Sequence, residues 1–370
     1  MTPEDIHLPP YQGHCVKVSV INGSKAHMLA EMLVAPAPRD GWQKHMKLAN
    51  YSFLIESPDL GKKVLFDLAF MKDLDDRMPP ALKALFAGGN EADSGVDEVH
   101  DVPETLQAHG VDLAGIDAVV WSHGHIDHVG DPSVFPPSTE LVVGPGFKAS
   151  YLPGYPTNPE AFLLDSAFEG RSVRELDFES SSSSSSSSSI ITTIGGFPAL
   201  DFFGDGSFWL LHAPGHTGHH LAGLCRTTED SWILLGGDAC HNAAQLRPSE
   251  YRPLPESVPA AVLGKRPPPD WCSCAHLSRM LHPPHPQGQS LAGSSFYGLA
   301  PGMHDDLAAA EGTVDKLKAF DGRDDVLVVI AHDASLLEVL DFFPQSLNAW
   351  RSNDWAAQGR WRFLRDLEST

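Results

Sequence analysis

The chain has 370 residues, of which 42% are hydrophobic and 20% are charged, and its formal net charge is −22. This length allows one large domain or two ordinary ones, and the apolar fraction is that of a globular protein with an ordinary core. The strong negative charge argues against a nucleic-acid partner, whose phosphates need a basic face, and against binding to anionic membranes.

The N-terminal residues are polar, and no run in the sequence approaches the length of a membrane span. The five cysteines are odd in number and scattered: Cys15, Cys225, Cys240, Cys272 and Cys274. A secreted disulfide framework would need an even and more regular set. We therefore expect a cytoplasmic protein with reduced thiols.

Strand-like apolar runs occupy the first half of the chain at residues 15–21, 50–56, 63–68, 116–120 and 140–143. Residues 22–49 mix Gly, Pro, Met and Trp without a clear period, which predicts a long loop. Helical pieces are expected at 80–86 and 103–108, because each has Pro in its first turn and Gly beyond its end.

The second half begins with an expected surface insertion at 171–190, which contains an unbroken serine run at 180–189. Serine has little to bury and competes with its own backbone for hydrogen bonds, so we expect this run to be flexible. Strands are then expected at 199–203, 207–212, 221–226, 232–235 and 326–330.

Residues 243–303 are rich in proline and too long for an ordinary connection, which predicts a lid-like insertion. A clear amphipathic helix is expected at 305–320, capped by Asp305 and ended by Gly322. The tail at 345–370 has the pattern of short amphipathic pieces. We expect a single domain over residues 1–370, with its core at about 15–340.

The most informative stretch is His123-Gly124-His125-Ile126-Asp127-His128, which directly follows the expected strand at 116–120. Packing a core does not require such residues, and solvated loops rarely place three imidazoles beside a carboxylate. Imidazole and carboxylate groups are common ligands of divalent transition metals. This strand end therefore predicts binding of two metal ions.

Three further strand ends carry residues of the same kind, namely His216, Asp238 and His332. Each alone would more often be a core histidine or a turn residue. Together with the first cluster, however, they give about seven potential ligands, which is the number that two metal ions sharing a bridging carboxylate require. The expected assignment is His123, His125 and His216 on one ion, Asp127, His128 and His332 on the other, and Asp238 between them.

The order of these motifs resembles the metallo-β-lactamase superfamily: His-x-His-x-Asp-His, then Pro214-Gly215-His216-Thr217, then Gly237-Asp238, then a late histidine. The resemblance implies an α/β fold, a four-layer αβ/βα sandwich of two mixed sheets flanked by helices, with the metals at one edge between the sheets. It also implies that Asp67 orients a ligand, although a strand-end turn explains that residue equally well. His220 is a further candidate for such a supporting role.

Within the superfamily, Asp238-Ala239-Cys240-His241 and His332-Asp333 look like the lactonase branch, whose metal-dependent acyl-homoserine lactonases have Asp-Ala-Ser-Tyr at the first position. His241 replaces the tyrosine and is a candidate for substrate contact or proton donation. Residues 130–136 and 143–147 are similar to hydrolases of filamentous fungi, some of which open the γ-lactam ring of benzoxazolinones.

The resemblance implies hydrolysis of a lactone or lactam by a hydroxide held between two divalent ions, with Zn²⁺ expected and Mn²⁺, Fe²⁺ or Co²⁺ open. Thioester hydrolysis is the alternative, and a non-catalytic metal-binding module is a third possibility. The partner is a small molecule, and the oligomeric state is open. Expected catalytic residues are Asp127, Asp238 and His241; expected substrate contacts are His241, Trp42, Trp271 and Tyr297.

Overall fold

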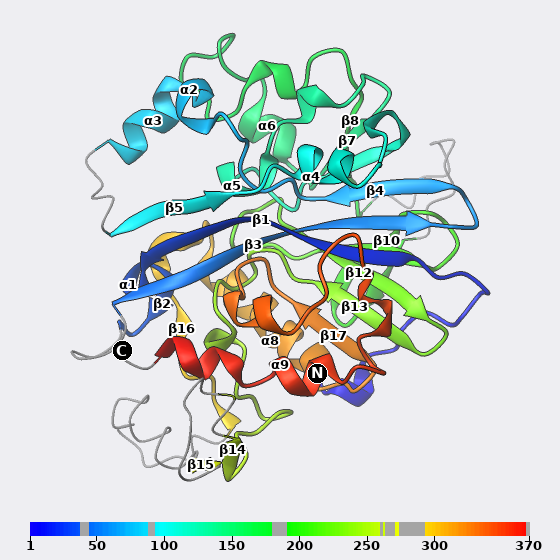
Figure 1. Ribbon diagram of the computed structural model, residues 1–370, viewed down its shortest axis with the longest axis vertical. Coiled ribbons are helices and arrows are strands. Elements are labelled where there is room, and N and C mark those ends of the chain that lie inside the picture. Colours follow the sequence, from blue (N-terminus) through cyan, green and yellow to red (C-terminus); the bar gives the residue numbers. More distant parts are fainter. Residues whose placement is uncertain are drawn as a thin grey trace.

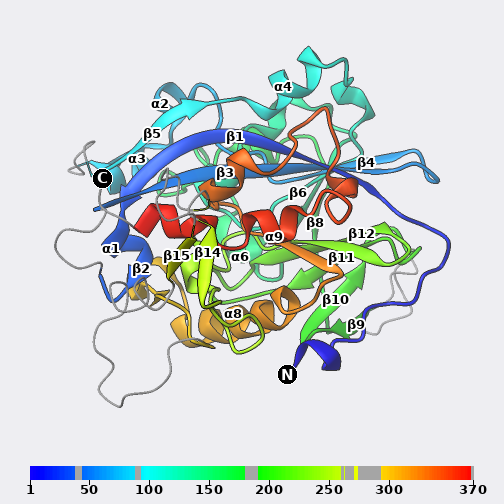
Figure 2. The ribbon, with the colours of Figure 1, turned by 60° about the horizontal axis from the view of Figure 1, so that its bottom comes forward.

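The computed structural model describes residues 1–37, 44–87, 93–179, 191–259, 262, 271–273 and 293–367. Two β-sheets lie face to face, and helices cover their outer faces (Figures 1 and 2). The longest helix, α8 (Leu307–Asp321), packs against the second sheet, and α4 (Val102–Ala108) packs against the first. The layers are therefore helix, sheet, sheet and helix.

The first sheet has the order β5-β1-β3-β4-β6-β7-β8, and the second has the order β17-β13-β12-β11-β10-β9. Both sheets are mixed, because β4, β6, β7 and β8 run parallel in the first and β13 and β17 run parallel in the second. The first contains β5 (Ser94–Val99), β1 (Lys17–Leu29), β3 (His45–Ser57), β4 (Lys62–Phe66), β6 (Ala118–Val120), β7 (Glu140–Val143) and β8 (Val173–Glu175). The second contains β17 (Val326–Val329), β13 (Ser231–Leu235), β12 (Leu221–Thr228), β11 (Phe208–His212), β10 (Phe197–Asp201) and β9 (Ile191–Ile194).

Two small ladders lie outside the main sheets: β2 (Val34–Ala35) with β16 (Gly298–Leu299), and β14 (Ser257–Pro259) with β15 (Trp271–Ser273). The other α-helices of the described residues are short: α1 (Ala30–Leu33), α2 (Leu74–Arg77), α3 (Pro80–Phe86), α5 (Ile126–Val129), α6 (Phe147–Tyr151) and α9 (Trp355–Gly359). Single 3₁₀ turns link several elements, among them η5 (Ala243–Gln245), η8 (Pro301–Met303) and η9 (Ala334–Glu338).

Alternation along the strands divides the core into layers. On β13, Ile233 and Leu235 belong to the cluster between the two sheets, whereas Trp232 and Leu234 face the opposite way, toward α8. Successive side chains of a strand point to opposite faces, so one strand contributes to two layers. The nearly continuous apolar sequence of β13 follows from its burial on both faces.

The prediction of a long loop at residues 22–49 is wrong. β1 continues to Leu29 and pairs with β3 from His45 onward, with a register shift between Asn22 and Ser24. On its other side β1 pairs with β5, a strand that the sequence pattern did not indicate. One face of this extension is apolar, with Ala26 and Met28 opposite Leu48 and Met46, and the other face carries exposed polar contacts such as that between Lys25 Nζ and Glu98 Oε2 at 2.7 Å. The apolar alternation is interrupted at residues 22–24, where the register shifts.

The core also extends beyond the expected boundary near residue 340. Trp350 and Trp355 are buried in the cluster between the sheets. The side chain of Asn348 accepts a hydrogen bond from the backbone N–H of Val18 at 2.9 Å and donates one to the carbonyl of Val16 at 2.7 Å. The C-terminal segment thus packs against the first sheet and is hydrogen-bonded to the start of β1.

The expected insertions are described in part. β8 lies inside the segment 171–190, while the serine run falls outside the described residues. In the lid-like segment, Ala243, Ala244, Phe296 and Tyr297 are buried, and residues 263–270 and 274–292 fall outside the described residues. The two ends of this segment are therefore part of the core.

Candidate metal centre

The expected ligands come from the ends of strands at one edge of the sandwich. β13 and β17 are parallel, with Leu235 paired to Val329, so Asp238 and His332 each lie three residues beyond that pair. β4 and β6 are parallel in the first sheet, with Phe66 paired to Val120. Because parallel neighbours end at the same edge, these ligands meet although they are far apart in the sequence.

The structure brings all seven expected ligands together in two groups that share Asp238. In each group the potential ligand atoms all lie within 4.8 Å of one another. The first group contains His123, His125, His216 and Asp238, and the second contains Asp127, His128, Asp238 and His332. The two groups contain the same residues as the expected assignment, and binding of metal by them stays a prediction.

The first group is rich in imidazole. His216 Nε2 lies 3.1 Å from His123 Nε2 and 2.9 Å from His125 Nδ1, and 3.5 Å from Asp238 Oδ2. Burial, together with the neighbouring imidazoles, lowers the pKa of His123 and of His216 well below the usual value. Neutral rings keep the lone pairs that a metal ligand needs.

The second group is richer in carboxylate. Asp238 Oδ1 lies 3.1 Å from His128 Nε2 and 3.1 Å from His332 Nε2. The second carboxylate, Asp127 Oδ2, lies 3.5 Å from His332 Nε2 and 3.8 Å from His128 Nε2. Burial lowers the pKa of His128, but the carboxylates of Asp238, Asp127 and Asp67 outweigh this effect and raise that pKa well above the usual value. The group therefore favours positive charge at its centre.

The hydrogen bonds on the outer side of the rings test whether this group fits a metal. His128 Nδ1 contacts Asp67 Oδ2 and His332 Nδ1 contacts the carbonyl of Ala49, both at 2.8 Å, and both partners can only accept. Each Nε2 atom therefore faces the oxygens of Asp238, where it can carry either a proton or a metal ion. His128 Nε2 and Asp238 Oδ1 are buried and have no hydrogen-bond partner. A cation held between these two atoms would satisfy both, so the residues fit a divalent metal.

Asp67 supports this group from the end of β4. Its Oδ1 accepts the backbone N–H of Ser122 at 2.6 Å, and its Oδ2 accepts the Ser122 hydroxyl at 2.7 Å as well as His128 Nδ1. The backbone of Asp67 has φ 61°, a conformation that non-glycine residues adopt rarely and often at functional sites. Of the two alternatives for Asp67, these contacts favour the one that orients a ligand.

His220 supports the loop of Asp238. Its Nδ1 donates to the carbonyl of Ala213 at 3.0 Å, and its Nε2 accepts the backbone N–H of Asp238 at 3.0 Å. Gly237 has φ +52°, and a Cβ atom at this position would lie 2.6 Å from His220 Nε2. Glycine therefore lets the Asp238 backbone approach the ring, as the expected supporting role of His220 requires.

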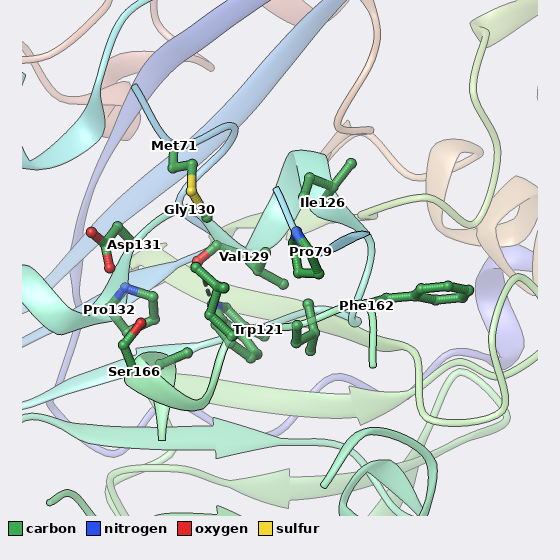
Figure 3. Close-up of a pocket in the computed structure, with 13 residues that line it drawn as sticks. Met71, Pro79, Trp121, Ile126, Val129, Gly130, Asp131, Pro132, Phe162 and Ser166 are labelled. Atoms are coloured by element: carbon green, nitrogen blue, oxygen red, sulfur yellow. Dashed lines mark hydrogen bonds between the residues drawn. The ribbon is translucent and has the colours of Figure 1, made fainter. Parts of the chain in front are cut away.

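The short helix α5, which carries Asp127 and His128, rests on apolar residues. Trp121 Nε1 donates to the carbonyl of Val129 at 3.0 Å and so fixes the end of the helix. Figure 3 shows Trp121, Val129 and Ile126 around a small pocket on this side of α5. Asp127 and His128 do not line that pocket. The pocket belongs to the support of the ligand helix.

The expected substrate contacts differ in their placement. His241 Nε2 lies 3.4 Å from Asp238 Oδ2, and the His241 ring stacks on that of His332 with 5.8 Å between centroids. Tyr297 is buried in the cluster that includes Leu33 and Phe296, and it belongs to neither ligand group of the described residues. Trp271 lies in β15, and Trp42 falls outside the described residues.

One histidine beside the centre had no local signal in the sequence. His304 is half-buried, and its ring centroid lies 5.4 Å from that of His216 and 5.7 Å from that of His241. Burial, with a contribution from His241, lowers the pKa of His304 to about 4. It stands just before the cap of α8 and far from any ligand motif, so only the fold reveals its position.

A profile of the metallo-beta-lactamase superfamily matches residues 48–332. The chain belongs to this superfamily, and the predictions of the family and of its four-layer fold are confirmed. Solved structures agree on the fold: an N-acyl homoserine lactone hydrolase with N-hexanoyl-L-homoserine at its catalytic metal centre has a TM-score of 0.54 at 13% identity, over 90% of this chain and 99% of that one.

Several sequence relatives come from fungi. The chain is 38% identical to the metallo-hydrolase mfmC of Annulohypoxylon moriforme, over 97% of this chain and 89% of that protein. It is 37% identical to the gamma-lactamase FDB1 of Fusarium pseudograminearum, over 87% of this chain and 75% of that protein. It is also 35% identical to the cytochrome P450 monooxygenase mpaDE' of Penicillium brevicompactum, but it spans only 39% of that longer protein's length.

None of the described helices is both long and apolar enough to cross a membrane.

Proposed function

We propose that this chain is a dinuclear metal-dependent hydrolase that opens a cyclic ester or amide, a lactone or a lactam. The observation that carries the proposal is the pair of ligand groups that share the carboxylate of Asp238. The hydrolase and lactamase names of its fungal relatives support the same class. Zn²⁺ is the proposed metal, since imidazole and carboxylate ligands suit it, as they also suit Mn²⁺, Fe²⁺ and Co²⁺.

When bound, two divalent cations lower the pKa of a shared water and polarise a carbonyl group, which promotes acyl hydrolysis. The residues of this chain position the reactants. Asp238 keeps 3% of its side chain exposed and joins both groups, whereas Asp127 keeps 24% exposed. Asp127 therefore lies where substrate can approach, and it can hold the proton that passes to the leaving group.

His241 has a separate part in this proposal. Its ring lies beside the shared carboxylate, and both of its ring nitrogens are buried without a hydrogen-bond partner. A bound substrate would supply such a partner, because unpaired buried polar atoms are unfavourable. We therefore place a polar group of the substrate against His241.

The test replaces Asp238 by alanine, with Asp324→Ala as a control at a side chain that is 82% exposed. We expect Asp238→Ala to lose metal from both groups and to lower lactone and lactam turnover by at least about 100-fold, because each ion loses a ligand. Elemental analysis measures the metal, and hydrolysis of γ-butyrolactone, 2-benzoxazolinone and an acyl thioester measures turnover. Two retained metals with unchanged hydrolysis would contradict the proposal, and hydrolysis of the thioester alone would support the alternative.

A further inference from the structure

His304 and His241 form a pair of imidazoles that spans both ligand groups. His304 packs edge-on against His216 of the first group, and His241 lies nearly parallel to His332 of the second, with 6° between the ring planes. The centroids of the pair are 5.7 Å apart. Neither residue belongs to a ligand group of the described residues. Their rings therefore adjoin the centre without forming part of it.

All four ring nitrogens of this pair are buried and have no hydrogen-bond partner. Leaving one buried polar atom unpaired costs about 1–3 kcal/mol, so four such atoms at one place indicate a missing polar group. By contrast, the ring nitrogens of His220 are both paired within the fold. Single unpaired nitrogens also occur at His128, His216 and His219, but among the described histidines only His241 and His304 have both ring nitrogens buried and unpaired.

The backbone holds His304 firmly beside His216. The backbone N–H of Asp305 donates to the carbonyl of His216, and that of Asp306 donates to the carbonyl of Gly215, each at 3.0 Å. The carboxylate of Asp305 accepts the N–H of Gly218 at 3.3 Å. These bonds join the start of α8 to the ligand loop, so the placement of His304 depends on the loop that supplies a ligand.

We propose that His304 and His241 form a polar subsite that binds a hydroxyl group next to the scissile carbonyl of the substrate. This inference rests on the proposed hydrolase function and adds the kind of substituent that the substrate carries. His304 acts as a specificity-determining residue.

The chemistry of the pair favours a group that both donates and accepts. A neutral imidazole offers one N–H and one lone pair, so two rings together offer two of each. A hydroxyl can use both kinds of atom, whereas an ether or ester oxygen can only accept. A carboxylate is disfavoured because Asp238 Oδ2 already lies 3.4 Å from His241 Nε2.

The experiment compares two probes that differ by one hydroxyl, γ-butyrolactone and α-hydroxy-γ-butyrolactone, on the metal-loaded full chain. We expect a preference of about tenfold in kcat/KM for the hydroxylated lactone, the equivalent of one well-placed hydrogen bond. His304→Phe keeps a ring but removes its nitrogens, so it should abolish the preference, and His304→Gln should restore part of it. His109→Phe is the control, because His109 is exposed and contacts the carbonyl of Thr105.

Calorimetric binding of the two ring-opened products, 2,4-dihydroxybutyrate and 4-hydroxybutyrate, gives a second readout. The wild-type protein should bind 2,4-dihydroxybutyrate with a lower Kd than 4-hydroxybutyrate. In His304→Phe this difference in Kd should disappear while the metal content stays unchanged. The subsite would be overturned if the wild-type protein had equal kcat/KM values for the two lactones, or if His304→Phe kept the preference for the hydroxylated lactone. Either result would leave the hydrolase function standing. Wild-type protein that opens neither lactone and does not open 2-benzoxazolinone either would contradict the proposed function and the subsite with it.

Discussion

At the scale of single residues, the geometry of the candidate metal centre depends on hydrogen-bond acceptors that fix the orientation of the histidine rings around Asp238. Asp67, the carbonyl of Ala49 and the carbonyl of Ala213 each accept from an Nδ1 atom, of His128, His332 and His220 respectively. These bonds leave the Nε2 atoms facing the carboxylate or backbone of Asp238. The identity of the ligands alone would not produce this arrangement.

We predict that Asp67→Asn weakens metal binding by about 10–100-fold, as is common when a group that orients a ligand is changed. An amide cannot accept all three hydrogen bonds that Asp67 now accepts from Ser122 and His128. Competition with a chelator of known affinity measures the effect. Asp59→Asn is the control, because Asp59 makes an exposed contact of the same length, 2.8 Å, with His14. Equal affinities in both variants would argue against the orienting role.

At the scale of elements, α8 connects the second sheet with the ligand loop. The helix begins at Leu307, and Asp306 caps it by accepting the N–H of Ala309 at 3.0 Å, one residue later than the expected cap Asp305. Asp305 instead contacts the loop of His216 through its side chain and its backbone. Two neighbouring aspartates thus have different partners, and only the fold distinguishes them.

We predict that Asp306→Ala lowers the free energy of unfolding by about 1 kcal/mol, the usual cost of a lost helix cap. Chemical denaturation measures this change. The control is Asp315→Ala on the same helix, whose side chain is 72% exposed and forms only an ion pair with Lys318. Exposed ion pairs contribute little, so the control should stay within about 0.5 kcal/mol of the wild type. A cap variant as stable as the control would show that the start of α8 is held by its other bonds.

At the scale of the whole molecule, the centre joins the two sheets. His123 and His128 follow β6 of the first sheet, whereas Asp238 and His332 follow β13 and β17 of the second. The backbone N–H of Leu221 also donates across this edge to the carbonyl of Ser122 at 2.8 Å. Bound metal would therefore link halves of the sandwich that the chain connects only through long segments.

We predict that chelation lowers the Tm, because a ligand that binds only the folded state stabilises it by about 4 kcal/mol at a concentration 1,000 times its Kd. For a chain of this size the decrease should exceed about 5 °C. Thermal unfolding with and without a chelator, followed by addition of Zn²⁺ or Mn²⁺, measures the effect and its reversal. Asp238→Ala should show little response to the chelator. A wild-type Tm that chelation leaves unchanged would contradict a metal link between the sheets.

Much of this protein could be read from its sequence because the relevant signals are local. The apolar strands that precede the ligands, the cluster at 123–128 and the residues His216, Asp238 and His332 are visible as strands followed by metal-binding side chains. Strands that are buried on both faces keep a clear apolar pattern. The arm formed by the end of β1 was predicted as a loop because Asn22-Gly23-Ser24, where the register with β3 shifts, interrupts the apolar pattern of the strand.

The sequence by itself supplied the candidate ligands, because they are local residue patterns at strand ends, and the order of these motifs resembled a family whose layered fold the resemblance implied. Only the tertiary structure decided that Asp67 faces His128 and that His304 stands beside His216 and His241. Contacts between residues that are far apart in the chain leave no local pattern, because they arise from the register of the sheets and from the backbone bonds that join the loops at their edge.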